Sequence, residues 1–371
     1  MKILFLWTHL SGYLVANLNA AVDSGHEIHL LHFGDHEETP FGDSLNLSKL
    51  SSFKSLGMSS REIRKIINDI EPDLIVVCGW HIRQYRFALF LNRALVVLYM
   101  DNQWKGTIKQ KLALMISRFF IKTHFDFAFL PGARQREYAL KLGFPTDRIW
   151  LRALNADTRL FEGKRSSGEI DAFLYVGRLS PEKGIVELLN AYEEYRLSTP
   201  LPWKLDVIGD GPLSNELIGK VGVTWHGFLN QYELVEYYEA PSVFIMPSLR
   251  EAWGVAMHEA ALTGHPIIAT KTCGASDELV RENLNGYLFI PGDHKGLVST
   301  LIRISQLKPE VLSGFGHMSY KLAKDFNSRT WIETLNQINE SAIAADLREK
   351  RSKSFLRLIA DLILNWNVKK W

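Results

Sequence analysis

The stretch from Pro247 to Glu259 constrains the fold of this chain more than any other. It follows an apolar run, Val243–Met246, that is typical of a buried strand. It leads into Ala256–Thr263, which has the composition of a helix and is followed by Gly264. A strand, a turn and a helix start form the unit that binds ligands at the carboxyl edge of open α/β sheets.

Two carboxylates flank the predicted helix start near Gly254 and Val255. Free backbone N–H groups and the positive end of the helix dipole favour an anion there, such as a diphosphate. Glu251 and Glu259 are eight positions apart, about 12 Å along a helix, so they cannot act as a close pair on one turn. We predict that Glu259 binds a ribose, as an acidic residue does in dinucleotide folds, and that Glu251 binds a sugar. The alternative is an exposed loop Glu and a helix-surface Glu.

The same stretch resembles the Glu-x7-Glu motif of the retaining glycosyltransferases of family 4, which have the GT-B fold. In that family the motif runs Pro-Ser-x-x-Glu, an aromatic residue, Gly, then Glu-Ala and Gly-x-Pro. The matching residues here are Pro247, Ser248, Glu251, Trp253, Gly254, Glu259, Ala260, Gly264 and Pro266. The resemblance extends more weakly over most of the chain. It implies two doubly wound Rossmann-like domains that face each other across a cleft, and retention of anomeric configuration in the product.

The length of 371 residues exceeds one ordinary core and predicts two domains. We expect an acceptor-side domain at residues 1–155 and a nucleotide-sugar-binding domain at residues 156–328. Residues 329–371 would then form helices that cross back to the first domain, ending in a basic amphipathic tail.

Charge, cysteine content and the length of apolar runs indicate where the protein is located and what it does not bind. The net charge of +2 gives no indication of nucleic-acid binding. Cys78 and Cys273 lie in or beside apolar runs, which favours buried free thiols over a disulfide. Ile3–Trp7 is too short for the core of a secretion signal, and no apolar run reaches the length of a membrane span. We therefore expect a cytoplasmic protein.

Strand-like and helix-like patterns alternate from Ile3 to Leu142, which predicts a parallel doubly wound sheet. Asp35–Phe53 is polar and is predicted to be irregular. The sequence from Ser59 to Glu62 has the pattern of a capping box at the start of a helix.

Two residues of this first half are candidates for the site. Gly12 follows the first predicted strand, and the resemblance implies that a Gly-containing loop here faces the donor diphosphate; an ordinary turn is the alternative. Asp101 follows the strand that ends at Met100, where the family often has a His. Asp101 could bind the sugar or accept the proton of the acceptor, or it could cap a helix or a turn.

In the second half, Gly177–Gly184 follows a predicted strand, and the resemblance implies that Arg178 and Lys183 bind the diphosphate. Two cations at a strand end can neutralise the charge that grows on a nucleoside diphosphate leaving group, which a divalent metal does in other enzymes. The chain has no Asp-x-Asp sequence, so we expect no metal and no cofactor. The alternative is a pair of solvated loop charges. The resemblance also implies a contact with the donor base at His226 and Leu229.

Two segments combine apolar and basic residues. Trp104–Phe125 has five Lys or Arg and no acidic residue, which fits either a helix with a solvated basic face or a surface for anionic lipid. From Arg348 to the end there are seven basic and two acidic residues. This tail predicts an amphipathic helix that contacts the inner face of a membrane, or that packs on the first domain or a second subunit.

Together these features predict a retaining glycosyltransferase. It would move a hexose-type sugar from a UDP- or GDP-linked donor to a hydroxyl of a glycan or lipid-linked acceptor in cell-envelope polysaccharide or lipopolysaccharide synthesis. The predicted catalytic residues are Glu251, Arg178, Lys183 and Asp101. The rivals are a sugar-nucleotide epimerase, which needs no acceptor, and a non-catalytic nucleotide-sugar-binding subunit. The sequence leaves the base, the sugar, the acceptor and the oligomeric state open.

Overall fold

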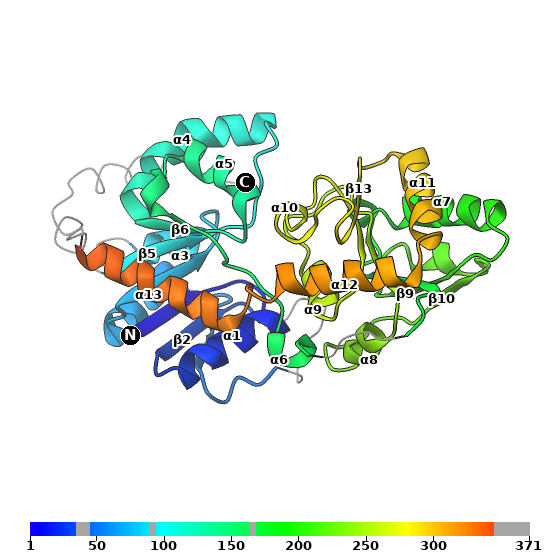
Figure 1. Ribbon diagram of the computed structural model, residues 1–371. Helices are drawn as coiled ribbons and strands as arrows, with labels where there is room; N and C mark the ends of the chain where they lie inside the picture. The colour runs from blue at the N-terminus through cyan, green and yellow to red at the C-terminus, as the bar shows by residue number, and fades with distance from the viewer. Residues whose placement is uncertain (35–44, 90–93, 164–167, 345–371) are drawn as a thin grey trace. The chain divides into compact units, whose positions relative to one another are not determined.

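The computed structural model describes residues 1–34, 45–89, 94–163 and 168–344. Its chain divides into two units. The first unit contains Met1–Leu154 and the helix that starts at Ser328, and the second contains Asn155–Asn327. Both units are α/β structures, as Figure 1 shows.

The first unit is built on a parallel sheet in the order β3-β2-β1-β4-β5-β6-β7. Its strands are β1 (Lys2–Leu6), β2 (Glu27–His32), β3 (Ser51–Lys54), β4 (Leu74–Cys78), β5 (Leu95–Tyr99), β6 (Phe127–Phe129) and β7 (Ile149–Trp150). The chain runs outward from β1 in both directions, which is the strand order of doubly wound Rossmann-like sheets. The central strands β1, β4 and β5 are apolar and almost entirely buried, as both faces of a parallel sheet are covered.

The helices of this unit cover that sheet. They are α1 (Gly12–Asp23), α2 (Ser60–Ile70), α3 (Arg83–Ala88), α4 (Ile108–His124), α5 (Ala133–Leu142) and α13 (Ser328–Ala344). α13 comes from the far end of the described chain and lies beside α1 (Figure 1). Trp331 anchors it: its ring stacks on Phe5 at a centroid distance of 5.9 Å, and its Nε1 donates to the Ala153 carbonyl at 3.0 Å.

The second unit repeats the same plan with six parallel strands in the order β10-β9-β8-β11-β12-β13. Its strands are β8 (Ala172–Val176), β9 (Lys204–Ile208), β10 (Val223–Trp225), β11 (Val243–Met246), β12 (Ile267–Thr270) and β13 (Gly286–Phe289). Its helices are α6 (Thr158–Phe161), α7 (Ile185–Ser198), α8 (Leu234–Glu239), α9 (Val255–Leu262), α10 (Ser276–Leu279), α11 (His294–Ser305) and α12 (Pro309–Ala323). The predicted fold class, two doubly wound Rossmann-like units, is therefore confirmed.

The predicted start of the second helix is confirmed, because its residue pattern depends only on contacts between neighbouring residues. Ser59 and Glu62 form the predicted capping box: the Glu62 amide donates to Ser59 Oγ, and the Ser59 amide donates to the Glu62 carboxylate. Of the segment Asp35–Phe53, predicted to be irregular, residues 35–44 lie outside the described residues. The prediction was wrong at the end of the segment, because β3 pairs with β2 there. β3 is a polar edge strand with one neighbour, so it needs no apolar run.

We predict that Trp331→Ala lowers the free energy of unfolding by about 3–5 kcal/mol, because it removes a large ring that is only 3% exposed. Trp331→Phe keeps a stacking ring and loses the hydrogen bond to Ala153, so its cost should be about 1–3 kcal/mol. Urea unfolding followed by circular dichroism measures both values. Ile343→Ala, at a position of α13 that is 62% exposed, is the matched control and should change stability by less than about 0.5 kcal/mol. A Trp331→Ala effect as small as that of the control would contradict the anchoring of α13.

Candidate functional site

Two loops meet at the carboxyl edge of the second sheet. The loop after β8 ends at Gly184, which has a φ of 70° and precedes α7. A Cβ on Gly184 would lie 2.3 Å from the Pro247 carbonyl oxygen in the loop after β11. The Arg250 amide also donates to the Glu182 carbonyl at 3.0 Å. The two loops therefore touch backbone to backbone, and glycine is required at the point of contact.

This contact brings Lys183 and Glu251 together although they are 68 positions apart. Lys183 Nζ donates to Glu251 Oε2 at 2.6 Å, and the side chains are 25% and 11% exposed. Ser248 Oγ lies 3.4 Å from the same carboxylate oxygen and donates to it. The predicted cation and the predicted sugar-binding carboxylate thus form one ion pair that remains partly open to solvent.

Arg178 lies on the same loop and has its own carboxylate partner. Its guanidinium contacts Glu182 Oε1 at 2.5 Å, and the two side chains are about equally exposed. A hydrogen bond from Ser180, together with Arg178, lowers the pKa of Glu182 to about 2. Glu182 is therefore ionised at neutral pH and holds Arg178 in place on the loop.

Gly254 and Val255 form the start of α9, as predicted. Gly254 has a φ of 105°, and a Cβ there would lie 2.7 Å from Met246 Sδ. A pocket of about 90 Å³ lies here and is lined in part by Lys183, Glu251, Gly254 and Val255. This volume is small beside the roughly 300–1,000 Å³ of pockets that enclose a whole ligand. A helix start, a cation and a carboxylate around one small pocket suit the anionic centre of a larger ligand.

Glu259 lies in the second turn of α9 and is held from another helix. The buried Tyr238 of α8 donates its hydroxyl to Glu259 Oε2 at 3.0 Å. Burial raises the pKa of Glu259 to about 7; the nearby Asp157 carboxylate adds to this rise, and the Tyr238 hydrogen bond opposes it. Sequence reasoning assigned no role to Tyr238, and the two adjacent tyrosines in a predicted helix were the available signal.

The remaining candidates lie elsewhere. Both ring nitrogens of His226 are engaged, with Asp206 Oδ1 at 2.8 Å and the Tyr237 hydroxyl at 3.1 Å. The predicted contact of His226 with the donor base would therefore have to be made by its backbone. Leu229 is half-buried in the loop after β10. Gly12 is the first residue of α1, and Asp101 follows β5; both belong to the first unit.

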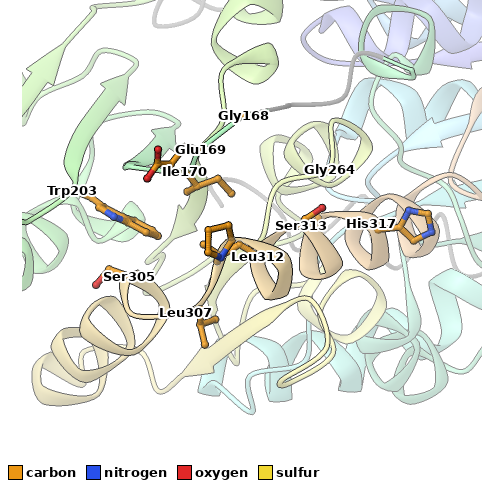
Figure 2. A pocket seen from close by; sticks show the side chains of 12 residues that line it. Gly168, Glu169, Ile170, Trp203, Gly264, Ser305, Leu307, Leu312, Ser313 and His317 are labelled. Atoms are coloured by element: carbon orange, nitrogen blue, oxygen red, sulfur yellow. The ribbon is translucent and has the colours of Figure 1, made fainter.

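A larger cavity of about 440 Å³ lies at the opposite edge of the second sheet (Figure 2). Its wall includes Ile170 and Trp203, which precede β8 and β9, and Leu312 of α12. Ile170 and Trp203 stand at the amino ends of their strands, whereas ligands of open α/β sheets bind beyond the carboxyl ends. We therefore place the candidate site at the smaller pocket.

Three further findings concern the described residues alone. Among them, no three His, Cys, Asp or Glu side chains are grouped as a metal site would require. No described helix has the length and apolar character needed to cross a bilayer. Cys78 and Cys273 are both free thiols.

The two Rossmann-like units have the GT-B class of fold. Residues 158–316 match the family model described as "Glycosyl transferases group 1". This segment contains Arg178, Lys183, Glu251 and Glu259 and lies within the second unit.

Known glycosyltransferases are similar in sequence to parts of this chain. The amylovoran biosynthesis glycosyltransferase AmsK of Erwinia amylovora is 26% identical over 227 residues, which are 57% of this chain and 55% of that protein. The lipopolysaccharide 1,6-galactosyltransferase of Escherichia coli is 31% identical over 146 residues, 36% of this chain and 39% of that protein. The match thus spans about half or less of these relatives. The Anabaena HepE structure with UDP and glucose superimposes with a TM-score of 0.72 at 18% identity, covering 92% of this chain and 100% of HepE.

The raised pKa of Glu259 predicts a pH dependence of stability. Between about pH 4.5, its ordinary value, and about pH 7, the native state keeps a proton that the unfolded chain releases. Stability should therefore fall as pH rises through this window. At about 1.4 kcal/mol per pKa unit, the fall is up to about 3 kcal/mol.

Urea unfolding of the wild type and of Glu259→Gln between pH 4.5 and 8 measures this effect as a difference. His258 and His265, whose pKa values burial lowers to about 4, contribute equally to both proteins. Tyr238→Phe should shift the fall to higher pH, because it removes a hydrogen bond that lowers the pKa of Glu259. A difference that stays constant across the pH range would show that Glu259 titrates normally.

Proposed function

We propose that this chain is a retaining glycosyltransferase of family 4 that transfers a hexose from a UDP-linked donor to a hydroxyl of a glycan or lipid-linked acceptor. The observation that carries the proposal is the Lys183–Glu251 ion pair, which lies on two touching loops beside the start of α9. A nucleotide sugar has a diphosphate next to a polyhydroxyl ring. A cation next to a carboxylate matches that order of groups.

In the proposed complex, Arg178, Lys183 and the first N–H groups of α9 bind the diphosphate. Glu251 accepts hydrogen bonds from the hydroxyls of the transferred hexose. Glu259 accepts hydrogen bonds from the ribose, and the backbone at His226 and Leu229 contacts the base. Both cations already have carboxylate partners, at 2.5 Å and 2.6 Å, so they are positioned before the donor arrives.

The proposed reaction breaks the bond between the anomeric carbon and the diphosphate oxygen. The acceptor hydroxyl oxygen forms the new bond on the same face of the sugar, and its proton passes to the leaving diphosphate. This course retains configuration without the two carboxylates about 5 Å apart that a double displacement needs. Charge grows on the leaving group, where Arg178 and Lys183 stabilise it, so we propose a reaction that needs no metal and no cofactor. Asp101 is proposed as an alternative acceptor of the proton.

The named relatives support the choice of donor and pathway. HepE was crystallised with UDP-glucose, which supports uracil as the base. AmsK is named for amylovoran biosynthesis and the Escherichia coli enzyme for lipopolysaccharide, which supports a role in cell-envelope polysaccharide synthesis. A lipid-linked acceptor is consistent with the basic tail, and we propose peripheral contact of that tail with the inner face of the membrane. The tail beyond Ala344 lies outside the described residues.

The first experiment is a thermal-shift assay of UDP, GDP, ADP and their sugars with EDTA present. A ligand that binds the native state alone raises the melting temperature, and we expect UDP and one UDP-sugar to give the largest shifts. Incubation of that donor without an acceptor then tests the rivals: an epimerase would convert it, and a binding subunit would leave it unchanged with every acceptor. No shift with any nucleotide would refute the donor site.

We predict that Lys183→Ala lowers kcat/KM for transfer by about 100- to 1,000-fold, because one charge-stabilising donor is lost from the transition state. Glu251→Gln keeps the shape of the side chain and should lower kcat/KM by at least tenfold. Steady-state assays with a fixed acceptor measure both values. Lys295→Ala, at an exposed position of α11, is the matched control and should leave kcat/KM unchanged. Equal activity of Lys183→Ala and the control would remove Lys183 from the mechanism.

A further inference from the structure

Helix α4 carries a second apolar face that points away from its own unit. Ile108, Leu112 and Met115 are 77%, 53% and 75% exposed. Their spacing of four and three residues places them on one side of the helix. Leu114 and Ile121, on the other side, pack against the core of the first unit. Figure 1 shows α4 at the outside of this unit, next to α5. The outer face therefore makes no contribution to the core.

Lysines surround this face. Lys109 and Lys111 lie on either side of the apolar stripe at about 100° of rotation per residue, and Lys105 precedes the helix. All three are exposed, and none has a carboxylate partner in the described part of the chain. The first turn of α4 contains no acidic residue, although the helix dipole favours acids and disfavours cations there. Positive charge at this helix start lowers the stability of the helix, so folding does not explain it.

We propose that the outer face of α4, formed by Ile108, Leu112, Met115 and the three lysines, docks on an anionic lipid bilayer. Amphipathic helices of this kind insert their apolar side chains at the boundary between head groups and acyl chains, while the lysines bind the acidic lipids. The proposal stands on this surface alone and does not depend on transferase activity.

Charge complementarity selects the bilayer over other occupants. The tail from Arg348 onward has seven basic and two acidic residues, so packing it on α4 would bring like charges together. A second copy of the same face would place lysines against lysines. An anionic membrane matches the charge of α4 and of the tail at the same time.

Co-sedimentation of the full chain with vesicles tests the proposal. We expect binding to phosphatidylcholine vesicles that contain 30% phosphatidylglycerol, weaker binding at high salt, and no binding to pure phosphatidylcholine. Replacing Lys105, Lys109 and Lys111 together by Gln should lower the partition coefficient by about 100-fold. Replacing Ile108, Leu112 and Met115 together by Ser should lower it at least tenfold. These side chains are exposed, so urea unfolding should be unchanged.

Two matched control variants have the same types of substitution at exposed positions of the second unit. The first control replaces Lys204, Lys295 and Lys321 by Gln, and the second replaces Leu197, Leu201 and Ile218 by Ser; all six positions are exposed. Both should bind vesicles like the wild type. The proposal is wrong if the α4 variants also bind vesicles like the wild type. It is also wrong if size measurements in solution show that the wild type is a dimer and that the Ser variant of α4 is a monomer, because the face would then bind a second copy.

A fluorescent label locates the contact. An environment-sensitive dye on Leu112→Cys should shift to the blue with anionic vesicles, and the same dye on Leu197→Cys should not. Burial raises the pKa values of the Cys78 and Cys273 thiols to about 12, so labelling at neutral pH is selective for the new cysteine. A label on Leu112→Cys that stays in water while the protein is membrane-bound would overturn the proposal.

Discussion

The ion pair of Lys183 and Glu251 joins the loops that follow two neighbouring strands, β8 and β11. Everything else at the carboxyl edge of the second sheet depends on how closely these loops approach. Gly184 allows the approach, because its missing side chain leaves room for the Pro247 carbonyl. The backbone bond from Arg250 to Glu182 then fixes the register of the two loops. A proposed donor meets a cation and a carboxylate that the fold has already oriented, so little side-chain entropy is lost on binding.

The carboxylates of the site differ because their surroundings differ. Glu182 accepts hydrogen bonds from Ser180 and Arg178, and its pKa is low. Glu259 is desolvated, has Asp157 nearby and receives one hydroxyl from Tyr238, and its pKa is raised. Near neutral pH the site therefore has one acid that is always ionised and another close to its titration point. Hydroxyl groups of a ribose would favour the ionised form of Glu259, so donor binding and loss of this proton are expected to be linked.

Sequence reasoning predicted the parts of the fold whose cause is local. Apolar runs such as Val243–Met246 identify the central strands, because both faces of a parallel sheet are covered. The capping box at Ser59 identifies a helix start, because its side chains accept hydrogen bonds from backbone N–H groups that have no partner within the helix. The edge strand β3 has a single neighbour and polar residues, so no pattern marks it. The partner of Glu259 was also beyond prediction, since Tyr238 reaches it from another helix, 21 positions away.

For the site residues too, separation in the sequence predicted some features, whereas the contacts between distant residues depended on the fold. Glu251 and Glu259 are eight positions apart, too far for a close pair on one helical turn, and the structure gives them separate partners, Lys183 and Tyr238. Sequence position alone does not show that Lys183 reaches Glu251, because the two lie 68 positions apart and meet only where β8 and β11 lie side by side. A parallel sheet makes such a meeting regular: it brings the loops after adjacent strands to one edge whatever their separation in sequence. A chain of this class can therefore vary its other loops and keep the cation and the carboxylate together.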